Sequence, residues 1–242
     1  MTSIGIFGRQ GRMGRAIEQE IDRIGGACAG GTDQGGDALA LAERADVLVD
    51  FSSPLALEGN VAAARAARTP IVIGTTGLDE THQGIIDAAA AEIAVLQTGN
   101  TSLGIALLGR LVRDAAARLG ADWDIEIVET HHRLKVDAPS GTALMLGDAA
   151  ARGLGTTLEE SGVIGRAGLV GARAGGTIGF ASLRGGSVIG DHQVVFAGEG
   201  ERIELGHRAD DRALFARGAV RAALWLAMAA PGRYTMDAVL DA

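Results

Sequence analysis

The sequence predicts a two-domain α/β protein, in which a doubly wound parallel sheet is followed by a smaller α+β domain with a mixed sheet. Two observations lead to this prediction. In roughly the first 100 residues, short apolar segments alternate with longer segments of helical pattern, as strands and helices do around parallel sheets. Later in the chain, three apolar segments follow one another with only short glycine turns between them, which is typical of hairpins.

Composition limits the class of protein. Of the 242 residues, 47% are hydrophobic but only 3% aromatic, so aliphatic side chains must fill the core. The net charge of −8 argues against a nucleic-acid partner bound on a basic surface, and the single cysteine excludes an internal disulfide. No apolar run reaches the roughly 20 residues of a membrane span, and the N-terminus carries no signal-peptide pattern. We therefore expect a cytoplasmic protein without a membrane partner.

The chain begins with the pattern of a dinucleotide-binding site. A short strand is expected over residues 3–7, a glycine loop over residues 8–14 and a helix over residues 13–24. In Rossmann-like domains such a loop and the helix N-terminus hold the pyrophosphate of the cofactor. The spacing here is G-x-x-G-x-x-G instead of the usual G-x-G-x-x-G, because Gln10 stands at the usual second glycine.

Asp33 follows a second predicted strand, over residues 27–31, about 20 residues beyond the glycine loop. An acidic residue at this place accepts hydrogen bonds from the adenosine ribose, although an ordinary turn aspartate is the alternative. Its charge would repel the 2′-phosphate of NADPH, and the next residue, Gln34, offers no positive charge. Arg9 is the nearest cation, and it would either reach the phosphate or lie over the adenine. We therefore expect NADH to be preferred, or both cofactors to be used.

The alternation continues with strands over residues 47–51, 71–74 and 94–97, which are separated by helices over residues 54–68 and 79–91. In parallel sheets, ligands lie at the carboxyl ends of the strands. The expected strand ends carry polar residues or glycines at residues 52–53, 74–77 and 98–102. Any one of them is more often only a turn, but together they predict a binding edge.

The second domain is expected to begin with a helix over residues 103–119 and a strand over residues 124–130. A further helix follows over residues 140–153. The mixed sheet would be completed by strands over residues 177–183, 188–197 and 202–208, and a last helix over residues 211–229 would return to the first domain.

The stretch from residue 129 to residue 143 collects the most reactive side chains. Its titratable and charged residues include His131, His132, Arg133, Lys135 and Asp137. Ser140 is expected to be the N-cap of the next helix, with backbone N–H groups at Gly141 and Thr142 that attract an anion. This combination suits a small carboxylate substrate that must also receive a proton. The alternative is a polar surface loop before a capped helix.

Five motifs give the chain a resemblance to a known family. It resembles the 4-hydroxy-tetrahydrodipicolinate reductase (dihydrodipicolinate reductase) family of bacterial diaminopimelate and lysine biosynthesis over nearly its full length. The motifs lie at residues 8–15, 72–77, 129–142, 176–180 and 218–225. The resemblance implies a cofactor domain of residues 1–102 and 212–242, and a domain of residues 103–211 for substrate binding and assembly into a homotetramer.

The resemblance also implies roles for single residues. His131 and Lys135 would be the catalytic pair, and a small dicarboxylate heterocycle would be bound by His132, Ser140, Gly141 and Thr142. The cofactor, NADH or NADPH, would be held at its pyrophosphate by Gly8, Arg9, Gln10, Gly11, Arg12 and Met13. Asp33 would bind the ribose, and the nicotinamide end would lie near Gly74, Thr75, Thr76, Thr98, Gly99, Asn100 and Thr101. No residue is assigned to a metal. The chain departs from the family pattern at Gln10, for glycine, and at Thr101, for phenylalanine.

Two other functions remain compatible with the residues themselves. One is a different small NAD-dependent dehydrogenase that acts on another carboxylate. The other is a non-catalytic NAD-binding module, which would not require His131 and Lys135 beside an anion site. Turnover of the family's substrate separates the three hypotheses.

Overall fold

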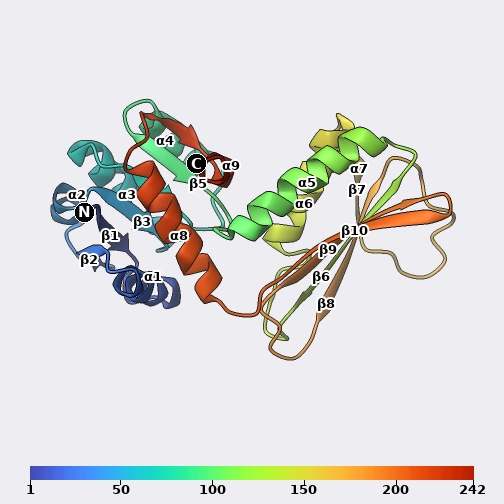
Figure 1. The fold of residues 1–242 in the computed structure, drawn as a ribbon, viewed down its shortest axis with the longest axis horizontal. Helices are drawn as coiled ribbons and strands as arrows, with labels where there is room; N and C mark the ends of the chain where they lie inside the picture. The colour runs from blue at the N-terminus through green and yellow to red at the C-terminus, as the bar shows by residue number, and fades with distance from the viewer. The chain divides into compact units, whose positions relative to one another are not determined.

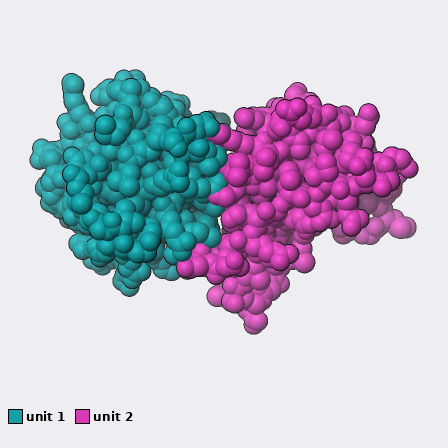
Figure 2. Space-filling model, viewed as in Figure 1, with its two compact units in different colours: residues 1–103, 213–242 teal, residues 104–212 magenta.

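The computed structural model describes residues 1–242 and divides into two compact units. Unit 1 comprises Met1–Leu103 and Ala213–Ala242, and unit 2 comprises Gly104–Arg212 (Figure 2). The predicted fold class, a parallel sheet with helices followed by a mixed sheet, is confirmed. None of the helices has both the length and the apolar character that crossing a membrane requires.

Unit 1 is a six-stranded parallel sheet in the order β11-β5-β4-β3-β1-β2 (Figure 1). Its inner strands are short runs of Val, Ile and Leu that are buried on both faces, as parallel strands between two layers of helices must be. The strands are β1 (Ser3–Phe7), β2 (Ala27–Thr32), β3 (Val47–Asp50), β4 (Ile71–Ile73), β5 (Ala94–Gln97) and β11 (Gly232–Tyr234).

Helices cover both faces of this sheet. On one face α2, α3 and α4 pack in a row over a core that includes Phe7, Leu48 and Ile73. On the other face α1 packs against α8, which returns from the end of unit 2 and also contacts β3, β4 and β5. The helices are α1 (Arg12–Arg23), α2 (Ala38–Arg44), α3 (Pro54–Ala67), α4 (Glu80–Ala90), α8 (Ala213–Leu226) and α9 (Met236–Leu240).

Helix α2 and strand β11 of unit 1, like the five-residue helix α9, were not predicted from the sequence. Helix α2 has only seven residues, and its one local signal is the Asp37 side chain, which accepts a hydrogen bond from the N–H of Ala40. Strand β11 has three residues and pairs only with β5. Its Arg233 side chain pairs with Asp87 of α4 and donates to Gln97 of β5. Both elements are too short for a periodic pattern, so tertiary contacts define them.

Unit 2 is a five-stranded mixed sheet in the order β10-β9-β6-β8-β7. The central strand β6 runs parallel to β8 and antiparallel to β9. The strands are β6 (Asp124–His131), β7 (Gly162–Ile164), β8 (Ile178–Arg184), β9 (Asp191–Gly198) and β10 (Glu201–Arg208). The helices are α5 (Leu103–Leu119), α6 (Gly141–Leu154) and α7 (Leu158–Ser161).

The alternation of β6 positions the reactive side chains. Ile125 and Ile127 are buried in the core that α5 and α6 share with the sheet, and the intervening side chains are only partly buried. Because successive strand residues point to opposite faces, Glu129 and His131 lie on the same helix-covered face as these isoleucines. The opposite face carries Glu126 and the partly exposed residues that follow it at every second position.

The glycine-rich segment before β8 is attached to the other face of the sheet by arginines. Arg173 donates to Asp124 at 2.6 Å, to Glu126 at 3.0 Å and to three backbone carbonyl oxygens. Arg166 donates to Glu126 at 2.9 Å. Burial raises the pKa of Glu126, but the hydrogen bonds from the two arginines outweigh it and lower this pKa.

We expect Gly218→Ala in α8 to lower the free energy of unfolding by about 1–3 kcal/mol, the typical cost of overpacking. A Cβ atom at this position would lie 1.8 Å from the carbonyl oxygen of Thr101, in the loop on which α8 packs. The matched control is Gly109→Ala in α5, where a Cβ atom would meet nothing within 4 Å. Alanine is a better helix former than glycine by up to about 1 kcal/mol, so the control should be neutral or stabilising in chemical denaturation. Equal stability of both variants would contradict this packing.

Candidate active site

The glycine loop of unit 1 follows a path that side chains would block. Gly8 has φ +82°, and a Cβ atom there would lie 2.7 Å from the carbonyl oxygen of Phe51. A Cβ atom on Gly14 would lie 2.2 Å from the oxygen of Gly8. Gly11 is the N-cap of α1, no side chain caps the helix, and its first turn contains no acidic residue. The loop and helix end therefore fit an anion such as a pyrophosphate, which backbone N–H groups can bind.

Asp33 lies beside the glycine loop, at the end of β2. Its two carboxylate oxygens accept hydrogen bonds from the backbone N–H of Gln10 at 3.1 and 3.3 Å. This contact joins the loop to the edge of the sheet and places a negative charge next to the predicted cofactor site. Gln10 thus contributes its backbone N–H at the position where the usual motif has a glycine.

Arg9 is held by contacts with β2 and α1. Its aliphatic stem lies against Gly31 of β2, where a Cβ atom would approach Arg9 Cβ to 2.6 Å. Its guanidinium pairs with Glu18 of α1, with 3.2 Å between Arg9 Nε and Glu18 Oε2. The hydrogen bond and the charge of Glu18 raise the pKa of Arg9, and the same hydrogen bond lowers the pKa of Glu18. Glu18 therefore neutralises the cation that the sequence offered to a 2′-phosphate.

A buried carboxylate joins the ends of β3 and β4. Asp50 is the last residue of β3 and is fully buried. Its oxygens accept hydrogen bonds from the Ser52 hydroxyl at 2.6 Å, the Thr75 hydroxyl at 3.0 Å and the Asn60 amide at 3.1 Å. Next to it, Gly74 lies so close to the Phe51 ring that a Cβ atom would approach it to 2.3 Å. The segment predicted for the nicotinamide end is therefore tightly held.

The loop after β5 is held by its own side chains. The Thr98 hydroxyl donates to the carbonyl oxygen of Asn100 at 2.7 Å, and the Asn100 side chain accepts from the N–H of Ser102 at 2.8 Å. Thr101 is buried, and its hydroxyl donates to the carbonyl oxygen of Phe215 in α8 at 2.7 Å. The threonine that departs from the family pattern thus directs its hydroxyl toward α8.

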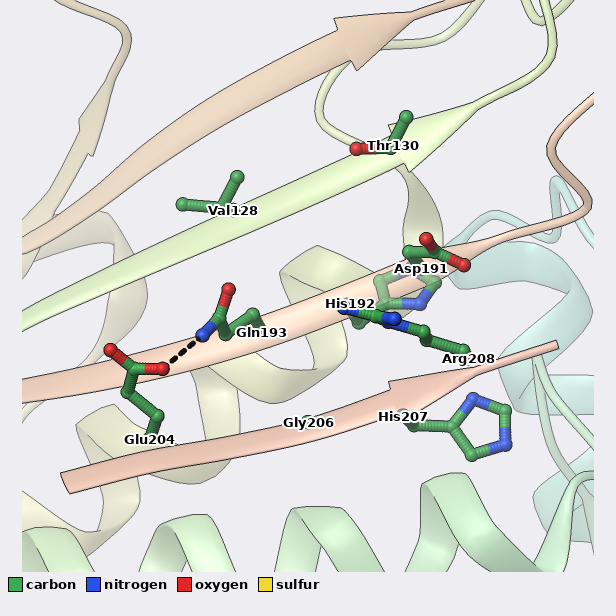
Figure 3. Close-up of a pocket in the computed structure, with 9 residues that line it drawn as sticks. All are labelled: Val128, Thr130, Asp191, His192, Gln193, Glu204, Gly206, His207 and Arg208. Atoms are coloured by element: carbon green, nitrogen blue, oxygen red, sulfur yellow. Dashed lines mark hydrogen bonds between the residues drawn. The ribbon is translucent and has the colours of Figure 1, made fainter. Parts of the chain in front are cut away.

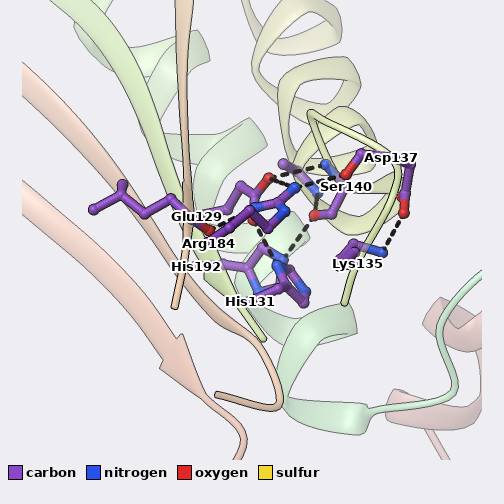
Figure 4. Close-up of polar contacts among 9 residues, drawn as sticks. Glu129, His131, Lys135, Asp137, Ser140, Arg184 and His192 are labelled. Atoms are coloured by element: carbon purple, nitrogen blue, oxygen red, sulfur yellow. Dashed lines mark hydrogen bonds and ion pairs between the residues drawn. The ribbon is translucent and has the colours of Figure 1, made fainter. Parts of the chain in front are cut away.

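In unit 2, a cluster of polar side chains surrounds Glu129 (Figure 4). Glu129 is only 1% exposed, and its carboxylate accepts hydrogen bonds from His131 Nδ1 at 2.5 Å and from the Ser140 N–H at 3.2 Å. Both terminal nitrogens of Arg184, in β8, also donate to it, at 2.8 and 2.7 Å. Burial raises the pKa of Glu129, but the hydrogen bonds from Arg184, Ser182 and His131 bring it down to about 2.

His131 is 8% exposed and is held in one tautomer. A carboxylate only accepts hydrogen bonds, so His131 Nδ1 carries the proton and Nε2 carries the lone pair in the neutral ring. Burial lowers the pKa of His131, and the charges of Lys135 and Arg184 lower it further, whereas Glu129 opposes them. A Cβ atom on Gly190 would lie 3.0 Å from Nε2, so a side chain at position 190 would crowd this edge of the ring.

His192 of β9 contacts the His131 ring edge to face, with 5.1 Å between the ring centroids. Its Nε2 atom lies 3.1 Å from the hydroxyl of Ser140. Burial, and then the charge of His131, lower the pKa of His192 to about 4. His192 is therefore a neutral ring that packs beside His131 at neutral pH.

The loop between β6 and α6 carries Lys135. Its ammonium lies 2.8 Å from the carboxylate of Asp137, and the carbonyl oxygen of Asp137 accepts a hydrogen bond from Arg184 at 2.6 Å. Burial raises the pKa of Asp137, but the hydrogen bond from Lys135 outweighs it and lowers this pKa. The loop ends at Ser140, which caps α6 as predicted and accepts from the N–H of Ala143 at 3.2 Å.

The structure thus brings together His131, Lys135 and the N-terminus of α6, which the sequence placed in one stretch. His132 lies in the same loop, and its Nδ1 atom is buried without a hydrogen-bond partner. Arg184 and His192 were missed, because they lie on β8 and β9, far from this stretch along the chain. The only local signal for Glu129 was its place two residues before His131 on a predicted strand.

A cavity of about 440 Å³ lies beside this cluster, on β6, β9 and β10 (Figure 3). Most of its lining belongs to the open face, for example Thr130 and Gln193, but His192 of the Glu129 cluster also lines it, whereas His131 and Lys135 do not. Gln193 donates to Glu204 across it at 2.7 Å. The cavity therefore adjoins the Glu129 cluster through His192, although most of it lies on the face opposite Glu129.

Two curated relatives are similar along the whole chain, and both are named 4-hydroxy-tetrahydrodipicolinate reductase. The protein of Zymomonas mobilis subsp. mobilis is 55% identical over 246 residues, which cover 99% of this chain and 97% of the relative. The protein of Parvibaculum lavamentivorans is 50% identical over 260 residues, which cover 97% of this chain and 96% of the relative.

Solved structures share the fold. The dipicolinate-bound dihydrodipicolinate reductase from Paenisporosarcina sp. TG-14 has a TM-score of 0.74 at 22% identity and covers 97% of each chain. A probable dehydrogenase from Thermotoga maritima has a TM-score of 0.60 at 11% identity and covers 99% of this chain and 92% of its own. Family models described as "Dihydrodipicolinate reductase, N-terminus" and "Dihydrodipicolinate reductase, C-terminus" match residues 2–101 and 104–240. The chain therefore belongs to the dihydrodipicolinate reductase family.

Proposed function

We propose that the protein reduces 4-hydroxy-tetrahydrodipicolinate to tetrahydrodipicolinate with NADH or NADPH, in the diaminopimelate and lysine pathway of bacteria. The observation that carries this proposal is the cluster of His131, Lys135 and the α6 N-terminus around a buried carboxylate, in a chain of this family. The cluster combines a proton-transfer group with cationic and N–H partners for carboxylates, as a dicarboxylate substrate requires.

Unit 1 is proposed to hold the cofactor, which supplies a hydride when it is bound. The glycine loop and the uncapped N-terminus of α1 would bind the pyrophosphate through backbone N–H groups. Asp33 would accept hydrogen bonds from the ribose. The segment from Gly74 to Thr76, held by Asp50, would face the nicotinamide end together with the loop of residues 98–101.

Unit 2 is proposed to bind the substrate. Lys135 and His132 offer positive charge or N–H donors for its carboxylates. Gly141 is the first residue of α6, and a Cβ atom added there would meet nothing within 4 Å. In its imidazolium form, His131 would donate a proton to the substrate from Nε2, because Nδ1 is committed to Glu129. Lys135 neutralises a carboxylate and is a second source of a proton.

Cofactor choice is proposed to favour NADH. The 2′-phosphate of NADPH would meet the carboxylate of Asp33 at the end of β2, and like charges in close contact repel each other. Arg9 is the neighbouring cation, but Glu18 already pairs with its guanidinium. NADPH must therefore break the Arg9–Glu18 pair or bind beside an unbalanced carboxylate, and NADH does neither.

We also propose that the protein is a homotetramer in the cytoplasm, as the family resemblance suggests. The face of the unit 2 sheet that no helix covers supports assembly, because apolar side chains lie exposed or half-buried there, among them Val128, Ala181, Leu183 and Val195. Burying these side chains against another copy would remove them from water.

The activity is tested with substrate generated by the preceding synthase, while NADH or NADPH absorbance is followed. His131→Gln should lower kcat by about 10²–10⁴-fold, the usual contribution of a proton-transfer group, and should leave NADH binding unchanged. Lys135→Ala should lower kcat and raise the KM of the substrate, because it removes a carboxylate partner. The control is Arg133→Ala, which removes a neighbouring cation whose side chain is exposed. NADH binding without turnover would favour the binding-module alternative, and turnover of another carboxylate alone would favour a different dehydrogenase.

Glu18→Gln should raise kcat/KM for NADPH by about 2–5-fold relative to NADH, since an exposed ion pair is worth at most about 1 kcal/mol. The change releases Arg9 toward the 2′-phosphate. Glu20→Gln is the matched control, because Glu20 lies on the same helix and pairs with Arg23 instead. In an Arg9→Ala background the Glu18 substitution should have no effect. A wild-type preference for NADPH would refute the role of Asp33.

Sedimentation velocity should give a mass about four times the 24.6 kDa of one chain. Ala181→Glu, which puts a charge on the exposed face of β8, should yield smaller species while the chain stays folded. Leu55→Glu is the control, because Leu55 is 98% exposed on α3 of unit 1. A monomeric wild type would show that the open face has no partner copy.

A further inference from the structure

We propose that Glu129 and Arg184 are positioning residues for the reaction, which hold the His131 imidazole in one tautomer and connect it to the loop that carries Lys135. The inference rests on the proposed function, because it assigns His131 and Lys135 as the reacting pair. Neither Glu129 nor Arg184 needs to touch the substrate for this role.

A charged residue at position 129 is unexpected for the fold. The alternation of β6 places Glu129 on the face where Ile125 and Ile127 enter the core. Burying a carboxylate is costly unless it is paired, and an apolar side chain usually serves a core position at least as well. Here several hydrogen bonds compensate the burial, one of them from His131, two positions away on the same face. The role of Glu129 therefore lies in what it holds.

The carboxylate determines which nitrogen of His131 is available. It accepts from Nδ1, so Nε2 is the atom that exchanges protons, and Gly190 places no side chain against that edge. The other charged or titratable groups near the ring are Lys135 of the loop, which pairs with Asp137, Arg184 of β8 and His192 of β9. Without Glu129 the imidazolium would face two cations and lack its nearest negative charge.

Arg184 connects the two reacting side chains. Its guanidinium donates to both oxygens of Glu129 and, at 2.6 Å, to the carbonyl oxygen of Asp137. The carboxylate of Asp137 in turn lies 2.8 Å from the Lys135 ammonium. A continuous path of polar contacts thus runs from His131 through Glu129, Arg184 and Asp137 to Lys135. The backbone N–H of Ser140 joins the start of α6 to the same carboxylate.

The test is Glu129→Gln, which keeps the size of the side chain but removes its charge and allows it to donate to Nδ1. We expect kcat to fall on the order of 10²-fold, as when the partner of a catalytic histidine is neutralised, while the dissociation constant of NADH stays unchanged. Glu129 raises the pKa of His131. The inflection of the pH–rate profile that belongs to His131 should therefore move to lower pH in the variant.

Glu126→Gln is the matched control. Glu126 lies on the same strand and pairs with two arginines, but on the opposite face. If the two glutamates had only a structural role, both variants would be less stable and neither pH–rate profile would move.

Glu129→Asp keeps the charge and should restore the inflection near its wild-type position. Arg184→Lys keeps a cation but cannot bridge Glu129 and Asp137, so it should lower kcat and also raise the KM of the substrate.

Histidine-selective ¹⁵N NMR gives a readout that does not depend on turnover. The wild type should show His131 protonated at Nδ1, and Glu129→Gln should show a mixture of tautomers or the Nε2-protonated form. If Glu129→Gln fails to fold, the same measurements on Glu129→Asp and Arg184→Lys are compared with the wild type instead. Wild-type kcat with an unmoved inflection, or an unchanged tautomer, would overturn the inference. A wild-type protein that shows the Nδ1 tautomer but does not turn over the substrate would refute the proposed function alone.

Discussion

The arrangement of unit 2 depends on one buried charge. A carboxylate in a protein core must be matched by donors on every side, and Glu129 meets this requirement with groups from β6, β8 and the start of α6. Each of these elements is therefore constrained by the same two oxygen atoms. The loop that carries Lys135 connects β6 to α6, and both of these elements are attached to the Glu129 carboxylate. Arg184 also holds this loop, at the carbonyl oxygen of Asp137. A structural requirement, the compensation of a buried charge, thereby produces a preorganised cluster.

Unit 1 reaches a comparable rigidity through backbone contacts. Gly8 and Gly14 allow the loop to pass so close to β3 and to α1 that any side chain would collide with a carbonyl oxygen. Asp33 then ties the loop to β2, and Asp50 ties β3 to β4. The carboxyl edge of the sheet is thus fixed by two aspartates that accept hydrogen bonds from neutral donors.

The two units use arginine differently. Arg9 lies at the surface and pairs with Glu18, an interaction that is easily exchanged for another anion. Arg184 is largely buried and donates to Glu129 through both terminal nitrogens, a geometry that lysine cannot reproduce. In the proposed function, the first pair would influence which cofactor is accepted, whereas the second would hold the histidine that transfers a proton. Exposure to solvent decides between these roles, because water screens the first pair and is excluded from the second.

Sequence by itself determined most of the fold and the stretch that bears His131, Lys135 and Ser140. Strand alternation, glycine spacing and helix caps are local properties, and local patterns can be read along one chain. Strand β11, the Arg9–Glu18 pair and the contacts of Arg184 with Glu129 were decided by the tertiary structure. Residue 184 reaches residue 129 only because β8 pairs with β6 in one register, so that His131 lies beside Arg184. No local pattern encodes that register, since it results from packing two distant segments against the same helices.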